Sequence, residues 1–185
     1  MIIGAVTYRK LLEEFAEDRY GLVTTKEAAT LGVPAAQLPK LAARGWLTHL
    51  GPGLYRCANT PLLGSFWQFA EAVARVGPEA YLVQDAVLSM HDLALVNPRY
   101  IRVATTKRIR HQIPSWVKVV KAAPGTRVLS YEGVRSTSVA QALVDSRGIV
   151  MAQRLLDAVE EAKRLGLINS VEHEQLLLEL AKPYK

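Results

Sequence analysis

The stretch from Gly21 to Arg56 constrains the fold of this chain most, because helix, turn and hairpin signals follow one another at short spacing. It reads GLVTTKEAATLGVPAAQLPKLAARGWLTHLGPGLYR. Thr24 and Glu27 have the spacing of a capping box, in which a hydroxyl and a carboxylate cap the first turn of a helix. Gly32 then predicts the tight turn after this helix, since glycine adopts a left-handed backbone conformation at little cost.

One helix is predicted ahead of this stretch and another after its turn. The first spans residues 7–19 and ends at Gly21. The later helix is expected to begin at Pro34 and end at Gly45, with Pro39 in its middle, where the missing N–H predicts a kink. The buried faces of the two helices are predicted to contain Leu11, Leu12, Phe15 and Ala16, and Leu38, Leu41 and Ala42.

A β-hairpin is predicted next, because Gly51-Pro52-Gly53 separates two apolar segments, 46–50 and 54–56. Large apolar side chains are mostly buried, so Trp46, Leu47 and Tyr55 are expected in the core and His49 on the strand surface. Helix, turn, helix and hairpin in this order predict a winged helix-turn-helix DNA-binding domain over residues 1–60.

The outer face of the later helix supplies the candidate DNA contacts. Lys40 and Arg44 are suited to phosphates, as are Arg56 and the wing backbone, while Gln37 is the sole amide that fits an adenine edge. Ala36 is expected on the same outer face.

Thr60-Pro61 predicts a boundary, after which residues 61–185 form a mixed α/β domain. Strands are predicted at 100–103, 116–120, 128–131 and 134–136. Helices are predicted around 66–73, over 86–95 with Asp85 as cap, over 139–146 with Ser138 as cap, over 151–164, and from Ser170 as cap to Pro183. The predicted fold class is α+β, a winged helix-turn-helix followed by a mixed domain that ends in a helical hairpin.

The basic charge is concentrated in the middle of the chain. The net charge is +6, yet residues 99–135 alone carry nine basic and one acidic side chain. Charge clustered in this way favours phosphate-rich or acidic partners. The densest run, residues 107–111, is either a contact for such a partner or a solvated hairpin tip. The candidate basic face comprises Arg99, Arg102, Lys107, Arg108, Arg110, Lys118 and Lys121.

No enzyme or cofactor signature accompanies these features. The four histidines, His49, His91, His111 and His173, lack metal-ligand spacing, and no phosphate-binding loop or nucleophile elbow is visible. Asp145 is expected to hold a backbone group or Arg147, and Cys57, the only cysteine, to be a half-buried structural thiol. We expect a non-enzymatic protein without metal or cofactor. With no apolar run near the roughly 20 residues of a membrane span, and no signal peptide, we expect it in the cytoplasm.

With both halves considered, the chain resembles the AbiEi family of antitoxins from type IV toxin–antitoxin systems, named for abortive infection. The resemblance is carried by TTKEAATLGV and LAARGWLTHLGPGLYR in the first half. In the second half it is carried by AVLSMHDLAL, IRVATTKRIRHQIP and GVRSTSVAQALVD. The family's DNA-contacting helix is commonly more basic than this one.

The resemblance implies an N-terminal domain that binds DNA repeats upstream of its own operon and represses transcription. It implies that residues 61–185 form an antitoxin domain that opposes a nucleotidyltransferase-like toxin, with or without a stable complex, and assists cooperative DNA binding. Carried over to this sequence, the DNA-facing residues are Ala35, Ala36, Gln37, Lys40, Arg44, Pro52 and Arg56.

Three alternatives remain open at this stage. The winged helix could serve as a protein-interaction module, since a fold alone does not establish a function. The chain could also be a general transcriptional regulator without an antitoxin role. A nuclease, or another enzyme that acts on nucleic acid, is the third.

Overall fold

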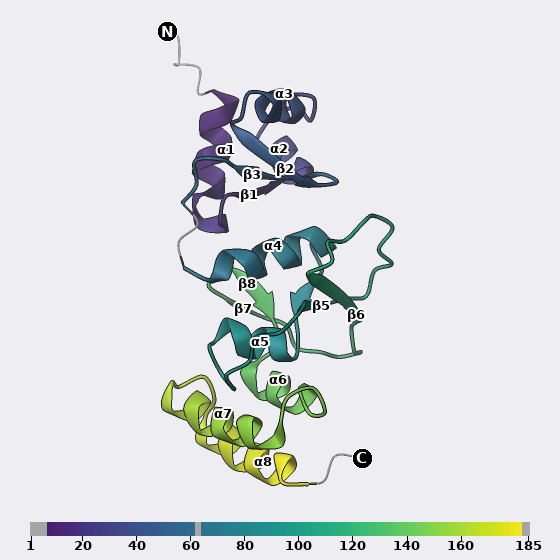
Figure 1. Ribbon diagram of the computed structural model, residues 1–185. Helices are drawn as coiled ribbons and strands as arrows, with labels where there is room; N and C mark the ends of the chain where they lie inside the picture. The colour runs from purple at the N-terminus through teal and green to yellow at the C-terminus, as the bar shows by residue number, and fades with distance from the viewer. Residues whose placement is uncertain (1–6, 62–63, 183–185) are drawn as a thin grey trace. The chain divides into compact units, whose positions relative to one another are not determined.

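A computed structural model describes residues 7–61 and 64–182, and the chain is an α+β protein (Figure 1). It divides into two compact units, which we call unit 1, up to Arg75, and unit 2, from Val76 onward. Unit 1 includes a helix beyond the boundary predicted at residue 60, and the division of function at that boundary stays a prediction.

Unit 1 is a winged helix-turn-helix, as predicted. Its three-stranded antiparallel sheet has the order β1-β3-β2. Strand β1 was not predicted from the sequence. The elements are α1 (Tyr8–Ala16), the 3-10 helix η1 (Glu17–Arg19), β1 (Leu22–Thr24), α2 (Thr25–Thr30), α3 (Gln37–Ala43), β2 (Leu47–Gly51), β3 (Leu54–Cys57) and α4 (Phe66–Val76).

The core of unit 1 joins α1, both helices of the helix-turn-helix and the sheet. Its buried residues include Leu12 from α1, Val23 from β1 and Leu38 from α3. Both components of the predicted capping box are present, because Glu27 N–H donates to the Thr24 hydroxyl and Thr24 N–H donates to the Glu27 carboxylate. The turn at Gly32 is also confirmed, with a φ of 78°.

The start of α3 differs from the sequence prediction. Pro34 is not its first residue, because the helix begins at Gln37 after a turn in which Gln37 N–H donates to the Pro34 carbonyl. Pro39 therefore falls in the first turn of α3 and not in its middle. Backbone N–H groups in the first turn have no acceptor within the helix, so Pro39 removes no helical hydrogen bond.

Unit 2 contains a mixed five-stranded sheet with the order β6-β5-β4-β8-β7. Helix α5 packs on β5 and on α6, and α6 contacts the hairpin formed by α7 and α8 (Figure 1). The elements are β4 (Tyr81–Leu82), α5 (Asp85–Met90), β5 (Ile101–Thr105), β6 (Val117–Lys121), β7 (Leu129–Tyr131), β8 (Val134–Ser136), α6 (Val139–Asp145), α7 (Ala152–Arg164) and α8 (Ser170–Leu180).

Two predicted helix caps are wrong by one residue. Gln84 precedes α5, and the carboxylate of Asp85 instead pairs with Arg102. Asn169 caps α8 and forms a capping box with Glu172. Gln84 makes no side-chain cap hydrogen bond, so only at α8 was a capping side chain missed. The cap of α6 by Ser138 is confirmed.

Other corrections concern the lengths and connections of elements. Helix α5 ends at Met90, because the backbone takes positive φ values at Asp92, Ala94 and Leu95. Helix α8 ends at Leu180, and Pro183 lies outside the described residues. The basic run 107–111 is not a hairpin tip, since the strands on either side, β5 and β6, pair in parallel.

No helix in the described part of the chain is long and apolar enough to cross a membrane.

Candidate nucleic-acid interface

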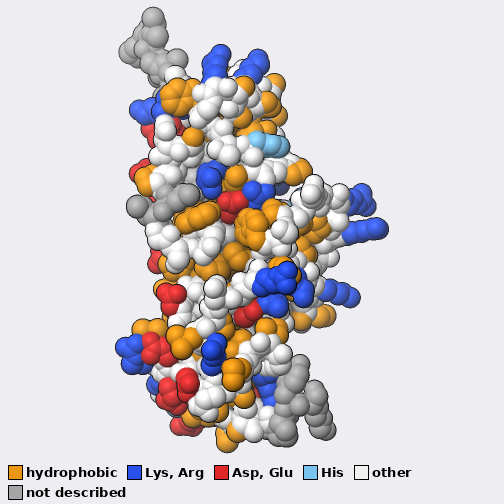
Figure 2. Space-filling model, viewed as in Figure 1, with side chains coloured by type: hydrophobic (Ala, Val, Ile, Leu, Met, Phe, Trp, Pro, Cys, Tyr) orange, Lys and Arg blue, Asp and Glu red, His pale blue; other side chains and the backbone are white. Residues whose placement is uncertain are grey.

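Helix α3 presents a narrow polar stripe opposite its buried face. Gln37, Lys40 and Arg44 follow one another at spacings of three and four residues, which places them on one side of a helix. Lys40 and Arg44 are exposed and Gln37 is half-buried, while Leu38 is fully buried. Figure 2 shows Lys and Arg side chains projecting from the surface over α3.

The ion pairs of unit 1 separate two kinds of basic residue. Four cations in residues 1–60 have a carboxylate partner: Arg9 with Glu13, Lys10 with Glu14, Arg19 with Glu27, and Arg56 with Glu71. Across the described ranges 7–61 and 64–182, Lys26, Lys40 and Arg44 have no carboxylate within 4.0 Å. All three unpaired cations lie on the helix-turn-helix.

Lys26 is a candidate contact that the sequence reasoning missed. It lies in the first turn of α2 and is exposed. A signal was available, because the positions three and four residues away, Val23, Leu22, Ala29 and Thr30, hold no carboxylate. The one acidic neighbour, Glu27, is used by the Thr24 cap and by Arg19.

Small side chains surround the polar stripe. Pro34, Ala35 and Ala36 form the exposed turn before α3. Such short side chains leave room for a phosphate backbone to approach the protein backbone closely. The predicted positions of Ala35 and Ala36 on the outer side are therefore consistent with a contact role.

The wing is a β-hairpin whose tip is bonded to the helix-turn-helix. Pro52 and Gly53 are exposed at the tip. The Gly53 carbonyl accepts a hydrogen bond from the Thr25 backbone N–H at 2.8 Å. On β2, His49 is exposed as predicted, and its ring lies 5.0 Å from that of Tyr55.

Arg56 differs from the other predicted contacts because its guanidinium is already bonded. Its Nη1 lies 3.2 Å from Oε2 of Glu71, a residue of α4, and the Arg56 side chain is 22% exposed. Lys40 and Arg44 have no carboxylate partner among the residues that the structure describes and can meet a phosphate directly, whereas Arg56 would first have to leave the carboxylate of Glu71.

Trp46 is less buried than predicted, while Leu47 and Tyr55 are in the core. Trp46 is 36% exposed, and the guanidinium carbon of Arg9 lies 3.4 Å from its ring centroid. Such a cation–π contact, with Arg9 also bonded to Glu13, covers part of the ring without burying it.

The predicted basic residues of unit 2 do not share one face of its sheet. Lys118 and Lys121 are three residues apart on β6, and side chains of a strand alternate between faces. Arg102 pairs in register with Lys118, but its side chain is only 16% exposed and is bonded to the buried carboxylate of Asp85. Arg102 is thus a structural residue of the contact between β5 and α5.

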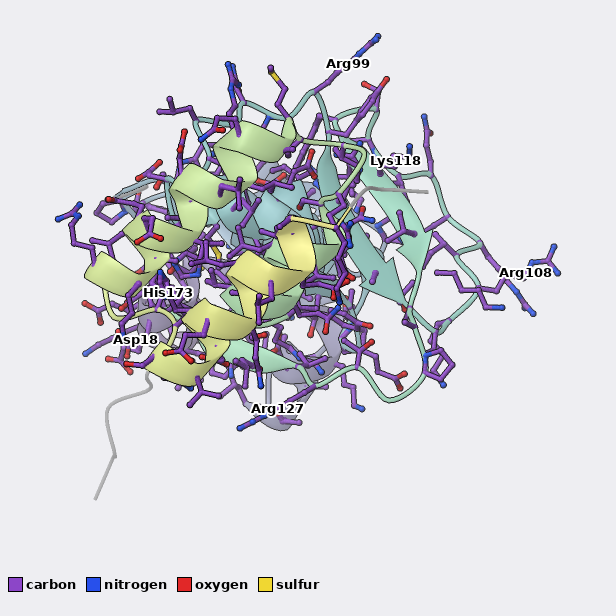
Figure 3. All side chains as sticks on the ribbon, turned by 90° about the horizontal axis from the view of Figure 1, so that it is seen from below. Asp18, Arg99, Arg108, Lys118, Arg127 and His173 are labelled. Carbon is purple, nitrogen blue, oxygen red and sulfur yellow. The ribbon has the colours of Figure 1, made fainter. Side chains whose placement is uncertain are left out.

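The remaining cations of this set are exposed. Lys107 pairs with Glu79 at 3.6 Å in an exposed ion pair. Arg99, Arg108 and Arg110 have no carboxylate partner among the residues that the structure describes, and neither do Lys118 and Lys121. In Figure 3, Arg99 and Arg108 point away from the ribbon, and Lys118 lies between them in this view. In Figure 2, Lys and Arg side chains project over the loop between β5 and β6.

The groups considered for chemistry have structural surroundings. Burial raises the pKa of Cys57 to about 11 and lowers the pKa of His91, which lies 4.4 Å from the ring of Tyr131. Asp145 accepts a hydrogen bond from Gln141, and Arg147 donates one to Glu179. Within the described ranges, no three His, Cys, Asp or Glu residues are grouped to hold a metal ion.

Unit 1 is a winged helix-turn-helix that exposes unpaired cations on its two central helices, and this defines the class of a DNA-binding regulator. Residues 10–58 match the family described as "Transcriptional regulator, AbiEi antitoxin". The match confirms, over the N-terminal region, the resemblance to the AbiEi family inferred from the sequence. No curated protein matches the chain.

Proposed function

We propose that this protein is an antitoxin that binds DNA upstream of its own operon through unit 1 and represses transcription there. The observation that carries the proposal is the position of the unpaired cations. Lys26, Lys40 and Arg44 lie on α2 and α3 of a winged helix within the family match. An unpaired cation needs no carboxylate to be displaced before it can bind a phosphate.

The family's description as an antitoxin supports the second half of the proposal, in which the protein opposes a nucleotidyltransferase-like toxin. Residues 61–185 are the proposed antitoxin domain, whether or not toxin and antitoxin form a stable complex. The proposed role of the exposed cations of unit 2 is to add phosphate contacts to those that unit 1 makes, and not to select bases.

Fluorescence anisotropy across a salt series tests the DNA-binding half. The protein is titrated into its own upstream duplex and into a scrambled duplex of equal length and composition. We expect tighter binding to the native duplex at every salt concentration. Replacing Lys40 and Arg44 together with alanine is expected to lower the slope of log K against log salt by about 1.8, because each phosphate contact contributes roughly 0.9.

Lys26→Ala provides a further check, and Lys10→Ala provides the matched control. Both residues are exposed lysines of unit 1, but Lys10 is paired with Glu14. We expect Lys26→Ala to lower the slope by about 0.9 and Lys10→Ala to leave it unchanged. Equal binding to both duplexes, with no effect of any α3 variant, would instead favour the protein-interaction module.

Growth rescue tests the antitoxin half. The protein is co-expressed with a toxin gene from the same operon and compared with a chain truncated after Arg75. Rescue by the full chain but not by unit 1 would assign antitoxicity to the second domain. Absence of rescue, together with retained operator binding, would leave a transcriptional regulator without an antitoxin role.

A further inference from the structure

One side of α4 faces strands β2 and β3 with three residues at successive helical turns. Trp67, Glu71 and Arg75 are spaced four residues apart, which places them on one face of the helix. Glu71 and Arg75 bond to the strands of the wing, and the guanidinium of Arg56 lies 5.9 Å from the ring centroid of Trp67.

Glu71 lies between two guanidinium groups. Its Oε1 accepts from Nε of Arg75 at 2.7 Å, and its Oε2 lies 3.2 Å from Nη1 of Arg56. The Glu71 side chain is only 7% exposed. A carboxylate buried to this degree is stable only when it is paired and hydrogen-bonded, so both arginines are needed to satisfy it.

Arg75 also reaches the strand that leads to the wing tip. Its Nη1 donates to the backbone carbonyl of Leu50. Leu50 lies at a break in the register of β2, where His49 pairs with Tyr55 and Gly51 with Leu54. A bulge of this kind leaves one residue unpaired and bends the strand, and here a side chain of α4 bonds the carbonyl of that residue.

We propose that Arg56, Glu71 and Arg75 form a positioning cluster that fixes the wing against α4, and that Arg56 acts in this cluster and not as a phosphate contact. This inference rests on the proposed function of unit 1 in DNA binding. It extends the DNA-binding unit through α4, beyond the boundary expected at residue 60. The wing tip and Lys40 then meet the duplex at a fixed spacing.

The two roles of Arg56 make different predictions in a salt series. Loss of a phosphate contact lowers the slope of log K against log salt by about 0.9. Loss of a positioning residue weakens binding at all salt concentrations and leaves the slope unchanged, because no phosphate charge is released. Removal of Glu71 also separates the roles, since Arg56 would then be free to bind phosphate.

The experiment measures binding of the full chain to its upstream duplex for Arg56→Met, Glu71→Gln and Lys40→Ala. Methionine keeps much of the apolar stem of arginine and removes its charge. We expect Arg56→Met and Glu71→Gln each to weaken binding about tenfold at every salt concentration, without a change of slope. Far-UV circular dichroism and urea unfolding establish that each variant is folded.

Lys40→Ala separates a failure of this inference from a failure of the proposed function. If Lys40→Ala lowers the slope and Arg56→Met lowers it equally, Arg56 is a phosphate contact and the positioning role is overturned. Tighter binding by Glu71→Gln would overturn it as well. If the wild type binds the native and a scrambled duplex equally and no variant, Lys40→Ala included, changes binding, the DNA-binding function itself fails. Should Glu71→Gln not fold, the slope measured for Arg56→Met still decides between the two roles.

Discussion

At the scale of single residues, burial controls the chemistry of Cys57. The thiol is 1% exposed in β3, and desolvation raises its pKa to about 11, with a smaller contribution from Glu13. Only the thiolate is nucleophilic, so a raised pKa makes the thiol less reactive. The sequence predicted a structural cysteine that is half-buried, and the structure buries it fully.

We predict that Cys57 reacts slowly with a thiol reagent in the native protein. At pH 8 a rise in pKa from 9.0 to about 11 lowers the thiolate fraction about 100-fold, and burial limits access further. The measurement is the rate of labelling at pH 8, in buffer and in urea. Labelling in buffer at the rate found for the unfolded chain would contradict the burial of Cys57.

The same shift predicts a loss of stability at high pH. Because the folded-state pKa lies above the unfolded value of 9.0, the unfolded state loses its proton first and is favoured as pH rises from 9 towards 11. The contribution is complete below pH 9 and declines by at most about 1.4 kcal/mol per pH unit. Urea unfolding of the wild type and of Cys57→Ala across this range isolates it, since the variant lacks this group.

Gly21 and Gly45 provide a matched test of backbone strain against steric crowding. Both have a φ of 76°, but a Cβ on Gly21 would lie 2.9 Å from Cβ of Thr60, whereas a Cβ on Gly45 would meet nothing within 4 Å. We expect Gly45→Ala to lower the free energy of unfolding by about 1–2 kcal/mol and Gly21→Ala to lower it by clearly more. Equal losses in urea unfolding would show that the backbone conformation alone matters.

At the scale of elements, a side-chain cap marks where α8 begins. Asn169 accepts from Glu172 N–H and Glu172 accepts from Asn169 N–H, both at 2.9 Å. Ser170, the predicted cap, is the first helical residue, and its hydroxyl accepts from the half-buried Lys163. Since Asn and Ser are both favoured cap residues, two neighbouring candidates are not separated by sequence alone.

We predict that the two residues have different effects on stability. Asn169→Ala is expected to lower the free energy of unfolding by about 1 kcal/mol, because it removes the cap. Ser170→Ala is expected to change it by less than about 0.5 kcal/mol, as for other exposed sites. Urea unfolding measures both, and a larger loss for Ser170→Ala would move the cap back to the predicted position.

At the scale of the whole molecule, the charge pattern divides into paired and unpaired groups. The basic excess of residues 99–135 includes Arg102, which is bonded to Asp85, and Lys107, which is paired with Glu79. The exposed arginines without a carboxylate partner among the described residues, such as Arg99, Arg108 and Arg110, are the better candidates for phosphate contacts.

Replacing Arg99, Arg108 and Arg110 together with alanine is therefore expected to lower the slope of log K against log salt, by up to about 2.7 if all three contact phosphates. The ratio of affinities for native and scrambled duplexes should stay unchanged, because phosphate contacts carry no base information. Arg127→Ala is the control, since Arg127 is exposed and lies on another side of unit 2 from Arg99 in Figure 3. An unaltered slope for the triple variant would show that the three arginines are solvated and contact no phosphate.

The sequence by itself determined the order of the helices and of the hairpin in unit 1, without strand β1, and most of the elements in unit 2. The capping box at Thr24, the turn at Gly32 and the hairpin at Pro52 depend on residues close in sequence, and all three are present. The stripe formed by Gln37, Lys40 and Arg44 also depends only on residues close in sequence, because residues three and four positions apart lie on one side of a helix.

The tertiary structure decided which charges are free and which short segments become strands. Strands β1 and β4 are only three and two residues long, and they form because they pair with β3 and β5. Arg56 and Arg44 look alike in the sequence, but Glu71 lies 15 residues away from Arg56 and bonds to it. Partners brought together by packing leave no local periodic signal, so only the folded chain distinguishes a bonded arginine from a free one.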